Sequence, residues 1–382
     1  MTILIIHLAP PDITSGGVVD SRNILISFNK ICRRNKDFIL ITNDKKLINI
    51  PSIKGNFKKI IYIPIDANPL YSLKLLTKIF FTILSLRYRQ NVNYRLIYQM
   101  EEYPLYIILL GLFSFLFRLK FVVKYHSYNY IYIKTIIYNV LHSLKVFQRI
   151  IYLIISLFLS FILRINHNIY IIAPNKNLAK VLNRVIKRNT AIYITPGNFL
   201  DPTPLVLDRN VQKSTQEYIC TISSAIDLDT ITISKLVYKY FNKPVLLIGK
   251  FYGPQQDLIS NIIRNIDYLK YFGLLKTREE VFRSFVSLCT SSFYILKRFE
   301  TWSYALYEML LLTSKVCVIS LRAEQCQIFK ELYSDIFKNN LNIIDACPVL
   351  LFKLNELDYY YIKSLNNNYI LYLCIFLQKL ME

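Results

Sequence analysis

The sequence predicts an α/β fold made of two domains, each with a parallel sheet that carries helices on both faces. Apolar, strand-like runs alternate with helical segments along the chain, as expected when parallel strands are joined by crossover helices. Proline and polar residues interrupt this alternation over 197–217, after which it restarts. The length of 382 residues suits two domains of ordinary size.

The first domain, 1–196, is expected to begin with a strand. Thr2–Leu8 is a continuous apolar run, which is typical of a strand buried on both faces. After a loop at 10–17, helices and strands alternate to the end of the domain. The expected strands are 38–42, 59–64, 96–99, 120–125, 168–173 and 191–195, and the expected helices are 18–33, 73–87, 104–117, 134–164 and 176–187.

The segment 197–217 is interpreted as a linker because its prolines interrupt any regular element. The second domain, 218–360, repeats the alternation, and 361–382 is expected to form a closing helix. The expected strands are 218–223, 245–248, 268–272, 291–296 and 316–320, and the expected helices are 230–241, 258–265, 278–285 and 301–312. Two such domains facing across a cleft place ligands at the carboxyl ends of their strands.

The composition excludes a disordered chain and indicates an anionic partner. Hydrophobic residues make up 53% of the sequence, and 47 Lys and Arg against 25 Asp and Glu give a formal net charge of +22. Such charge with 30 tyrosines also suits nucleic-acid binding. The basic residues are spread along the chain and no recognition motif is present, so no nucleic acid is expected as a partner.

The cysteines and the N-terminus indicate a reducing, cytoplasmic location. Seven cysteines, an odd number without CxxC spacing, argue against a zinc site or a disulfide framework. The N-terminus lacks the basic region and the small-residue cleavage site of a signal peptide.

Three apolar runs, 103–117, 150–163 and 369–377, are too short to span a membrane comfortably. A 14-residue helix is about 21 Å long, whereas a bilayer core is about 30 Å thick. Each run is therefore either a core helix or a helix that lies in the membrane interface. The positive charge would favour anionic lipids, so we expect peripheral association with an anionic membrane surface.

The most informative stretch runs from Glu300 to Glu308. Glu300 is expected on a loop where a strand ends and a helix begins, and Glu308 lies eight residues further on. Carboxylates at such a junction can accept hydrogen bonds from sugar and ribose hydroxyls. Two glutamates on a solvated helix face would have the same spacing.

At this stretch the sequence resembles the retaining GT-B glycosyltransferases with a Glu-x7-Glu motif, the family 4 or group 1 type. Other family motifs follow in the matching order over nearly the whole chain. They are the glycine pair in 9–17, the strand ending in histidine at 122–127, the late strand at 172–176, the segment at 194–201 that enters the second domain, and the strand end at 247–249.

The resemblance implies a transferase that moves a sugar from a nucleotide-sugar to a lipid-linked or envelope-glycan acceptor, with retention of configuration. Glu308 would hold the donor ribose, Glu300 would lie beside the donor sugar, and His126 would support the charge at its anomeric carbon. Backbone N–H groups of Gly16 and Gly17 would approach the diphosphate. The family needs no metal and no cofactor, since the nucleotide-sugar is a substrate.

One departure concerns the family's Arg and Lys that clamp the diphosphate. Thr221 and Ile226 occupy those positions, which removes a large electrostatic contribution to catalysis. Lys250, Lys297 or Arg298 would replace them at strand ends of the second domain. The alternative is a catalytically impaired scaffold of the same fold.

A second acidic pattern is Asp227-Leu228-Asp229, which matches the metal-binding Asp-x-Asp of another glycosyltransferase fold. Asp229 also immediately precedes the helix expected over 230–241. We therefore interpret Asp229 as the N-cap of that helix.

Overall fold

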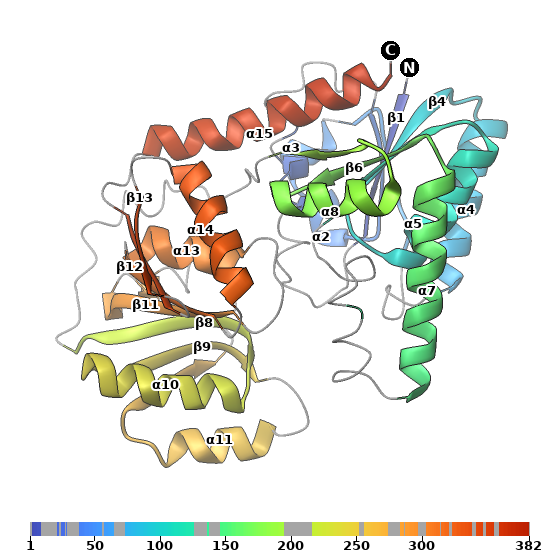
Figure 1. Ribbon diagram of the computed structural model, residues 1–382. Helices are drawn as coiled ribbons and strands as arrows, with labels where there is room; N and C mark the ends of the chain where they lie inside the picture. The colour runs from blue at the N-terminus through green and yellow to red at the C-terminus, as the bar shows by residue number, and fades with distance from the viewer. Residues whose placement is uncertain are drawn as a thin grey trace. The chain divides into compact units, whose positions relative to one another are not determined.

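The computed structural model divides into two compact units, Met1–Phe199 with Leu365–Glu382, and Leu200–Ser364. Each unit contains one seven-stranded sheet (Figure 1). The structure describes residues 2–8, 21–22, 24–26, 28, 38–55, 57–64, 73–125, 136, 146–194, 216–251, 256–273, 283–285, 287–296, 303–313, 315–320, 323–337, 341–346, 349–354 and 359–381.

The sheet of the first unit is parallel throughout, with strand order β3-β2-β1-β4-β5-β6-β7. Strand β1 is buried over its whole length, as its apolar run predicts. The order changes direction between β1 and β4, which is the topological switch point where α/β sheets bind ligands. The strands are β1 (Thr2–His7), β2 (Phe38–Thr42), β3 (Lys59–Tyr62), β4 (Tyr94–Gln99), β5 (Lys120–Lys124), β6 (Ile169–Ala173) and β7 (Ala191–Tyr193).

The helices of the first unit alternate with its strands along the chain, as expected when parallel strands are joined by crossover helices. They are α2 (Lys45–Ile48), α3 (Pro51–Lys54), α4 (Leu73–Tyr88), α5 (Pro104–Leu116), α7 (Val146–Ile165) and α8 (Lys176–Ile186). The C-terminal helix α15 (Tyr359–Lys379) returns to this unit, where Tyr369, Leu373 and Leu377 join the core formed by β1, β2 and β4.

The sheet of the second unit has the order β10-β9-β8-β11-β12-β14-β13, with its switch point between β8 and β11. Strand β14 runs antiparallel to both of its neighbours, β12 and β13, whereas a wholly parallel sheet was expected. No helix separates β14 from β13 along the chain, so β14 escapes a search for alternating strands and helices. The strands are β8 (Tyr218–Ile226), β9 (Val245–Phe251), β10 (Leu269–Gly273), β11 (Cys289–Leu296), β12 (Lys315–Ser320), β13 (Leu341–Ala346) and β14 (Val349–Leu354).

The helices of the second unit include one, α14, that the sequence analysis did not predict. The cap of α10 also differs from the expectation. Asp227, not Asp229, is the N-cap, and its side chain accepts a hydrogen bond from the backbone N–H of Thr230 at 2.9 Å. The helices are α10 (Leu228–Phe241), α11 (Gln256–Arg264), α13 (Tyr304–Thr313) and α14 (Ala323–Phe337).

The expectation that the protein lacks disulfides is wrong. Cys220 of β8 and Cys289 of β11 form a disulfide, with their Cα atoms 5.8 Å apart. Cys374 of α15 is also disulfide-bonded. The first pair is separated by 69 residues and meets only because β8 and β11 are neighbours. The cysteine pattern therefore no longer supports a reducing compartment.

None of the helices that the structure describes combines the length and the apolar character needed to cross a membrane. The apolar run at 150–163 lies in α7. That helix is apolar on both its buried and its exposed faces.

Candidate ligand sites at two switch points

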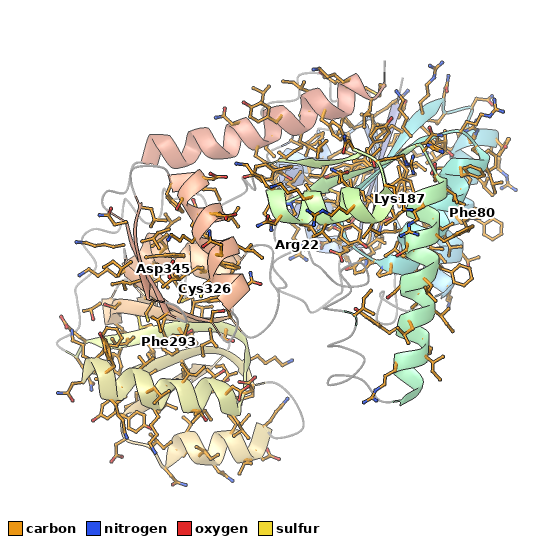
Figure 2. The ribbon with its side chains drawn as sticks, viewed as in Figure 1. Arg22, Phe80, Lys187, Phe293, Cys326 and Asp345 are labelled. Atoms are coloured by element: carbon orange, nitrogen blue, oxygen red, sulfur yellow. A yellow bond between two sulfur atoms is a disulfide. The ribbon has the colours of Figure 1, made fainter. Side chains whose placement is uncertain are left out.

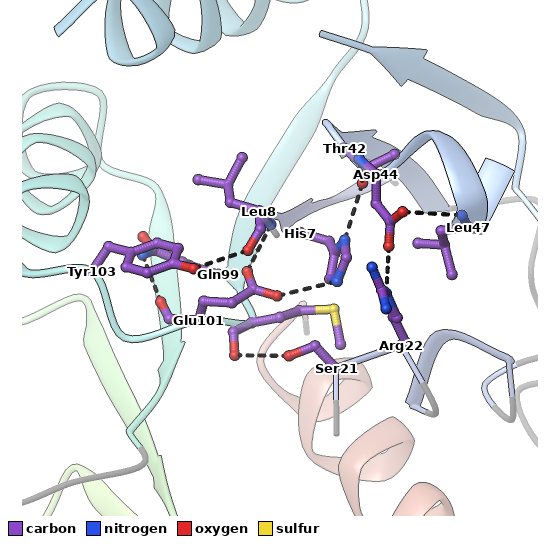
Figure 3. A network of polar contacts seen from close by, with 11 residues as sticks. His7, Leu8, Ser21, Arg22, Thr42, Asp44, Leu47, Gln99, Glu101 and Tyr103 are labelled. Atoms are coloured by element: carbon purple, nitrogen blue, oxygen red, sulfur yellow. Dashed lines mark hydrogen bonds and ion pairs between the residues drawn. The ribbon is translucent and has the colours of Figure 1, made fainter. Parts of the chain in front are cut away.

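A buried polar network lies at the switch point of the first sheet (Figure 3). His7 is the last residue of β1, and its side chain is fully buried. Its Nδ1 atom lies 3.0 Å from Oγ1 of Thr42 at the end of β2, and its Nε2 atom lies 3.4 Å from Oε1 of Glu101, just after β4. Three neighbouring strand ends are thus joined through one imidazole.

The same network fixes the backbone where the chain leaves β1. The N–H of Leu8 donates to Oε2 of Glu101 at 2.9 Å, and the hydroxyl of Tyr103 donates to the carbonyl of Leu8 at 3.2 Å. Gln99 donates its side-chain N–H to the carbonyl of Glu101 at 2.7 Å. These hydrogen bonds therefore hold the backbone of Leu8 in place directly before the segment that contains the predicted diphosphate loop.

Asp44 extends the network to the next loop. Its backbone N–H donates to Oγ1 of Thr42, and its side chain accepts from the backbone N–H of Leu47 in α2. Arg22 forms an ion pair with the Asp44 carboxylate. The Thr42 hydroxyl has a hydrogen to donate and a second lone pair with which to accept, so its hydrogen bond to Nδ1 of His7 can form with either tautomer of the imidazole.

Burial sets the charge state of the His7–Glu101 pair. It lowers the pKa of His7 to about 4 and raises the pKa of Glu101 to about 8. The hydrogen bond from Leu8 and the side chain of Ser21 only partly oppose the shift of Glu101. Both shifts favour the uncharged pair, a neutral imidazole beside a protonated carboxyl group.

We expect Glu101→Gln to remove a loss of stability at alkaline pH. A carboxyl group with a raised pKa stabilises the fold at low pH, and that contribution is lost as the pH rises from its ordinary value of 4.5 through about 8. Glutamine keeps the shape of the protonated acid and has no proton to lose. At about pH 9 the melting temperature of the Glu101→Gln variant should exceed that of the wild type. The difference should correspond to a few kcal/mol in the free energy of unfolding.

The matched control is Glu217→Gln, which removes an exposed carboxylate paired with Lys243. Thermal melts across pH should show the same alkaline decline in this control as in the wild type. An equal decline in Glu101→Gln would show that Glu101 is already ionised in the folded protein.

A buried lysine occupies the end of the neighbouring strand β5. Lys124 is buried, and its Nζ lies 5.2 Å from the centre of the Tyr369 ring of α15. Burial lowers the pKa of the Lys124 amine well below its usual range. The residue predicted to support the donor sugar, His126, comes two positions later and lies outside the described residues.

Gly249 and Lys250 lie at the carboxyl end of β9 in the second unit. Gly249 has a φ of +151°, and its carbonyl accepts a hydrogen bond from the Tyr271 hydroxyl at 2.9 Å. Lys250, predicted to bind the donor, is exposed at this edge. Its position leaves the ammonium group available to an anion.

Glu308 lies on α13, the helix that follows the switch-point strand β11. It is the fifth residue of that helix and is half-buried. The start of α13 is fixed because Oγ of Ser303 accepts from the backbone N–H of Leu306 at 3.1 Å. The hydroxyl of Tyr333 on α14 donates to the carbonyl of Ser303 at 3.0 Å. The carboxylate of Glu308 is therefore carried in the second turn of a helix whose start is anchored.

The two positions matched to the family's cationic clamp hold buried, uncharged side chains. Thr221 is buried within β8, and Ile226 is fully buried at the end of the same strand. Neither side chain can supply positive charge to a diphosphate. Gly16, Gly17, His126, Lys297, Arg298 and Glu300 lie outside the described residues, so their predicted roles stay predictions.

Sequence reasoning missed the His7–Glu101–Thr42 network because its members come from three separate strand ends. A polar residue closing an otherwise apolar strand was the available signal at His7. Among the described residues, no group of three or more His, Cys, Asp or Glu side chains could hold a metal ion.

The sequence matches no protein-family model and no curated protein. Among solved structures, trehalose 6-phosphate synthase from Burkholderia multivorans has a TM-score of 0.51 at 6% identity, covering 98% of this chain and 88% of that chain. This likeness shows the fold alone. It confirms the expected α/β class with two Rossmann-like sheets of the GT-B type.

Two further structures are less similar and carry no functional argument. The lipopolysaccharide outer core galactosyltransferase WaaB has a TM-score of 0.49 at 10% identity, covering 99% of this chain and 100% of that chain. UDP-N-acetylglucosamine 2-epimerase from Rickettsia bellii has a TM-score of 0.47 at 10% identity, covering 100% of this chain and 97% of that chain.

Proposed function

We propose that the protein is a retaining glycosyltransferase that moves a sugar from a nucleotide-sugar donor to a lipid-linked or envelope-glycan acceptor. The observation that carries this proposal is the position of Glu308. It lies on the anchored helix after β11, at the switch point of a Rossmann-like sheet. A ligand site is expected at that point in such a sheet.

In the proposed site, Glu308 accepts hydrogen bonds from the donor ribose and Glu300 lies beside the donor sugar. His126 supports the charge that develops at the anomeric carbon. Gly16 and Gly17 receive the diphosphate, and Lys250 and Arg298 supply the positive charge that Thr221 and Ile226 lack. The exposed ammonium of Lys250 supports its part in this arrangement. No metal or cofactor has a role.

The alternative is a catalytically impaired protein of the same fold. The buried, uncharged side chains of Thr221 and Ile226 favour it, because a departing nucleotide needs charge stabilisation. An impaired protein that kept the ribose contact would still bind nucleotides. Binding and turnover therefore separate the two functions.

A panel of nucleotide-sugars and their nucleoside diphosphates, screened by thermal shift, tests the proposal. A ligand that binds only the native state at about 100 times its Kd stabilises it by about 2.7 kcal/mol. We expect at least one nucleotide-sugar to raise the melting temperature by a few degrees. A panel in which no compound shifts the melting temperature would contradict nucleotide-sugar binding. Binding without turnover would favour the impaired scaffold.

We also propose that the protein works while peripherally associated with the cytoplasmic membrane face. An acceptor carried on a lipid would be reached there. The high positive charge supports attraction to anionic lipids.

A further inference from the structure

Helix α7 exposes an apolar stripe to solvent. Ile150, Leu153, Ile154, Leu157, Phe158 and Phe161 are exposed at helical spacing, and Leu157 is 71% exposed. The buried face of the same helix includes Ser156, whose hydroxyl donates to the carbonyl of Tyr152 at 2.8 Å. The rest of the buried face is apolar and includes Leu159 and Ile162, so α7 has apolar side chains on its outer face as well as its inner one, unlike a typical helix on a soluble domain.

The stripe continues onto two neighbouring helices. Helix α5 packs against α7, and Phe80 of α4 makes an edge-to-face contact with Phe113 of α5. Figure 1 shows α4, α5 and α7 side by side, and Figure 2 shows Phe80 on this side of the unit. The α4–α5–α7 surface comprises Phe80, Phe81, Tyr88, Leu109, Phe115, Leu116, Ile150, Ile151, Leu153, Ile154, Leu157, Phe158 and Phe161.

This surface holds more than half of the exposed large apolar side chains among the described residues. Scattered exposed apolar residues are ordinary, but a gathered set marks a binding site. Hydrogen bonds from Arg188 hold the C-terminal end of α7, the helix that carries part of this surface. Arg188 donates from Nη2 to the carbonyls of Leu163, Arg164 and Asn166 at the end of α7, at 2.9, 2.8 and 3.1 Å.

The charged residues of these three helices are of one sign. The sequences of α4, α5 and α7 contain no acidic residue, whereas they include Lys74, Lys78, Arg87, Arg149 and Arg164. An apolar face with only basic charges complements a layer that is apolar inside and anionic outside. A soluble protein partner would have to present both an apolar area and anionic groups on one surface.

A groove borders the surface at the end of α4. It has a volume of about 550 Å³, and its lining includes Phe81, Tyr88, Lys59 and Arg89. Aromatic side chains beside cationic groups suit the boundary between acyl chains and phosphate headgroups. Lys59 also donates to Oε1 of Gln90 at 2.6 Å, which orients its ammonium group at the groove.

We infer that the α4–α5–α7 surface is the site at which the protein docks on an anionic phospholipid membrane. Its apolar side chains enter the acyl region, and the basic residues contact the phosphate groups. The inference deepens the proposed function by naming the surface for the membrane partner. The proposed function supplies the reason why the protein would dock on a membrane. The docking itself does not depend on that function, because the lipid contacts involve none of the proposed donor-binding residues.

Flotation of the full chain with vesicles tests this inference. Vesicles of phosphatidylcholine with phosphatidylglycerol are compared with vesicles of phosphatidylcholine alone, at low and high salt. We expect Leu157→Glu to weaken binding to the anionic vesicles by about tenfold or more, because one inserted leucine is lost and a repelled charge is added. Arg89→Gln should weaken it by about fivefold.

The matched control is Leu236→Glu on α10, where the leucine is 61% exposed in the second unit. It should bind vesicles as the wild type does. Equal vesicle binding by Leu157→Glu and the wild type would overturn the inference. The inference would also be overturned if the wild type were a dimer and Leu157→Glu made it a monomer without changing vesicle binding.

A second readout separates this inference from the proposed function. Leu157→Glu should keep the thermal shift that nucleotide-sugars produce in the wild type. If no nucleotide-sugar binds but anionic vesicles bind through Leu157, the docking surface stands and the transferase proposal fails. If nucleotide-sugars bind and the vesicles do not, the docking inference fails alone.

Discussion

Gly249→Ala is expected to prevent the second unit from folding stably. A Cβ atom at this position would lie 1.8 Å from the carbonyl oxygen of Ser223, the residue paired with Gly249 across β8 and β9. The Ser223 carbonyl belongs to the backbone and the position of a Cβ atom is fixed by the backbone, so no side-chain rotation can relieve the overlap. The φ of +151° is itself a conformation that other residues rarely adopt. We expect a loss of roughly 4 kcal/mol or more, seen as low soluble yield and a lowered melting temperature.

Gly55→Ala supplies the control for that substitution. No heavy atom lies within 4 Å of its added Cβ, and its φ is −85°. Alanine there should leave stability unchanged or slightly raised, since it restricts the unfolded chain. Equal melting temperatures for the two variants would show that β8 and β9 are not paired as described.

Glu308→Ala and Glu300→Gln are expected to reduce sugar transfer the most while leaving the protein folded. Glu308→Ala removes the carboxylate that holds the donor ribose, and Glu300→Gln removes the charge beside the donor sugar. We expect kcat/KM to fall by about 100-fold or more in each variant. Glu308 is half-buried on a helix with an anchored start, so we expect the Glu308→Ala variant to keep its fold.

Glu331→Ala on α14 is the comparison for both variants. Glu331 is an exposed acid of the same unit, hydrogen-bonded to Gln327, and its loss should not alter transfer. Circular dichroism and melting temperatures check that all three variants stay folded. Undiminished turnover in both Glu308→Ala and Glu300→Gln would remove these two residues from the active site.

The sequence predicted elements well where the local apolar pattern is strong. The strand 38–42 matches β2, and the expected helix 73–87 is α4 to within one residue. Strand β14 was missed because it follows β13 without the crossover helix that marks parallel strands, and β13 was missed together with the helix α14 that precedes it. Local pattern thus defines elements better than it defines strand direction.

Contacts between distant segments could not be predicted in the same way. His7 and Glu101 meet because β1 and β4 are neighbours, and Cys220 meets Cys289 because β8 and β11 are neighbours. Strand order, which the sequence analysis did not assign, decides both pairs. One face of α7 is in the core and the other is exposed, so the 150–163 run is not a wholly buried core helix, and its contact with a membrane interface stays a prediction.

Analysis of the reaction product tests the central claim most directly. The protein is incubated with the nucleotide-sugar that stabilises it most and with a lipid extract as acceptor source, and the products are examined by mass spectrometry and NMR. The account predicts release of the nucleoside diphosphate and a sugar attached to the acceptor in the donor's anomeric configuration. An unchanged nucleotide-sugar, an epimerised sugar without transfer, or an inverted linkage would contradict it.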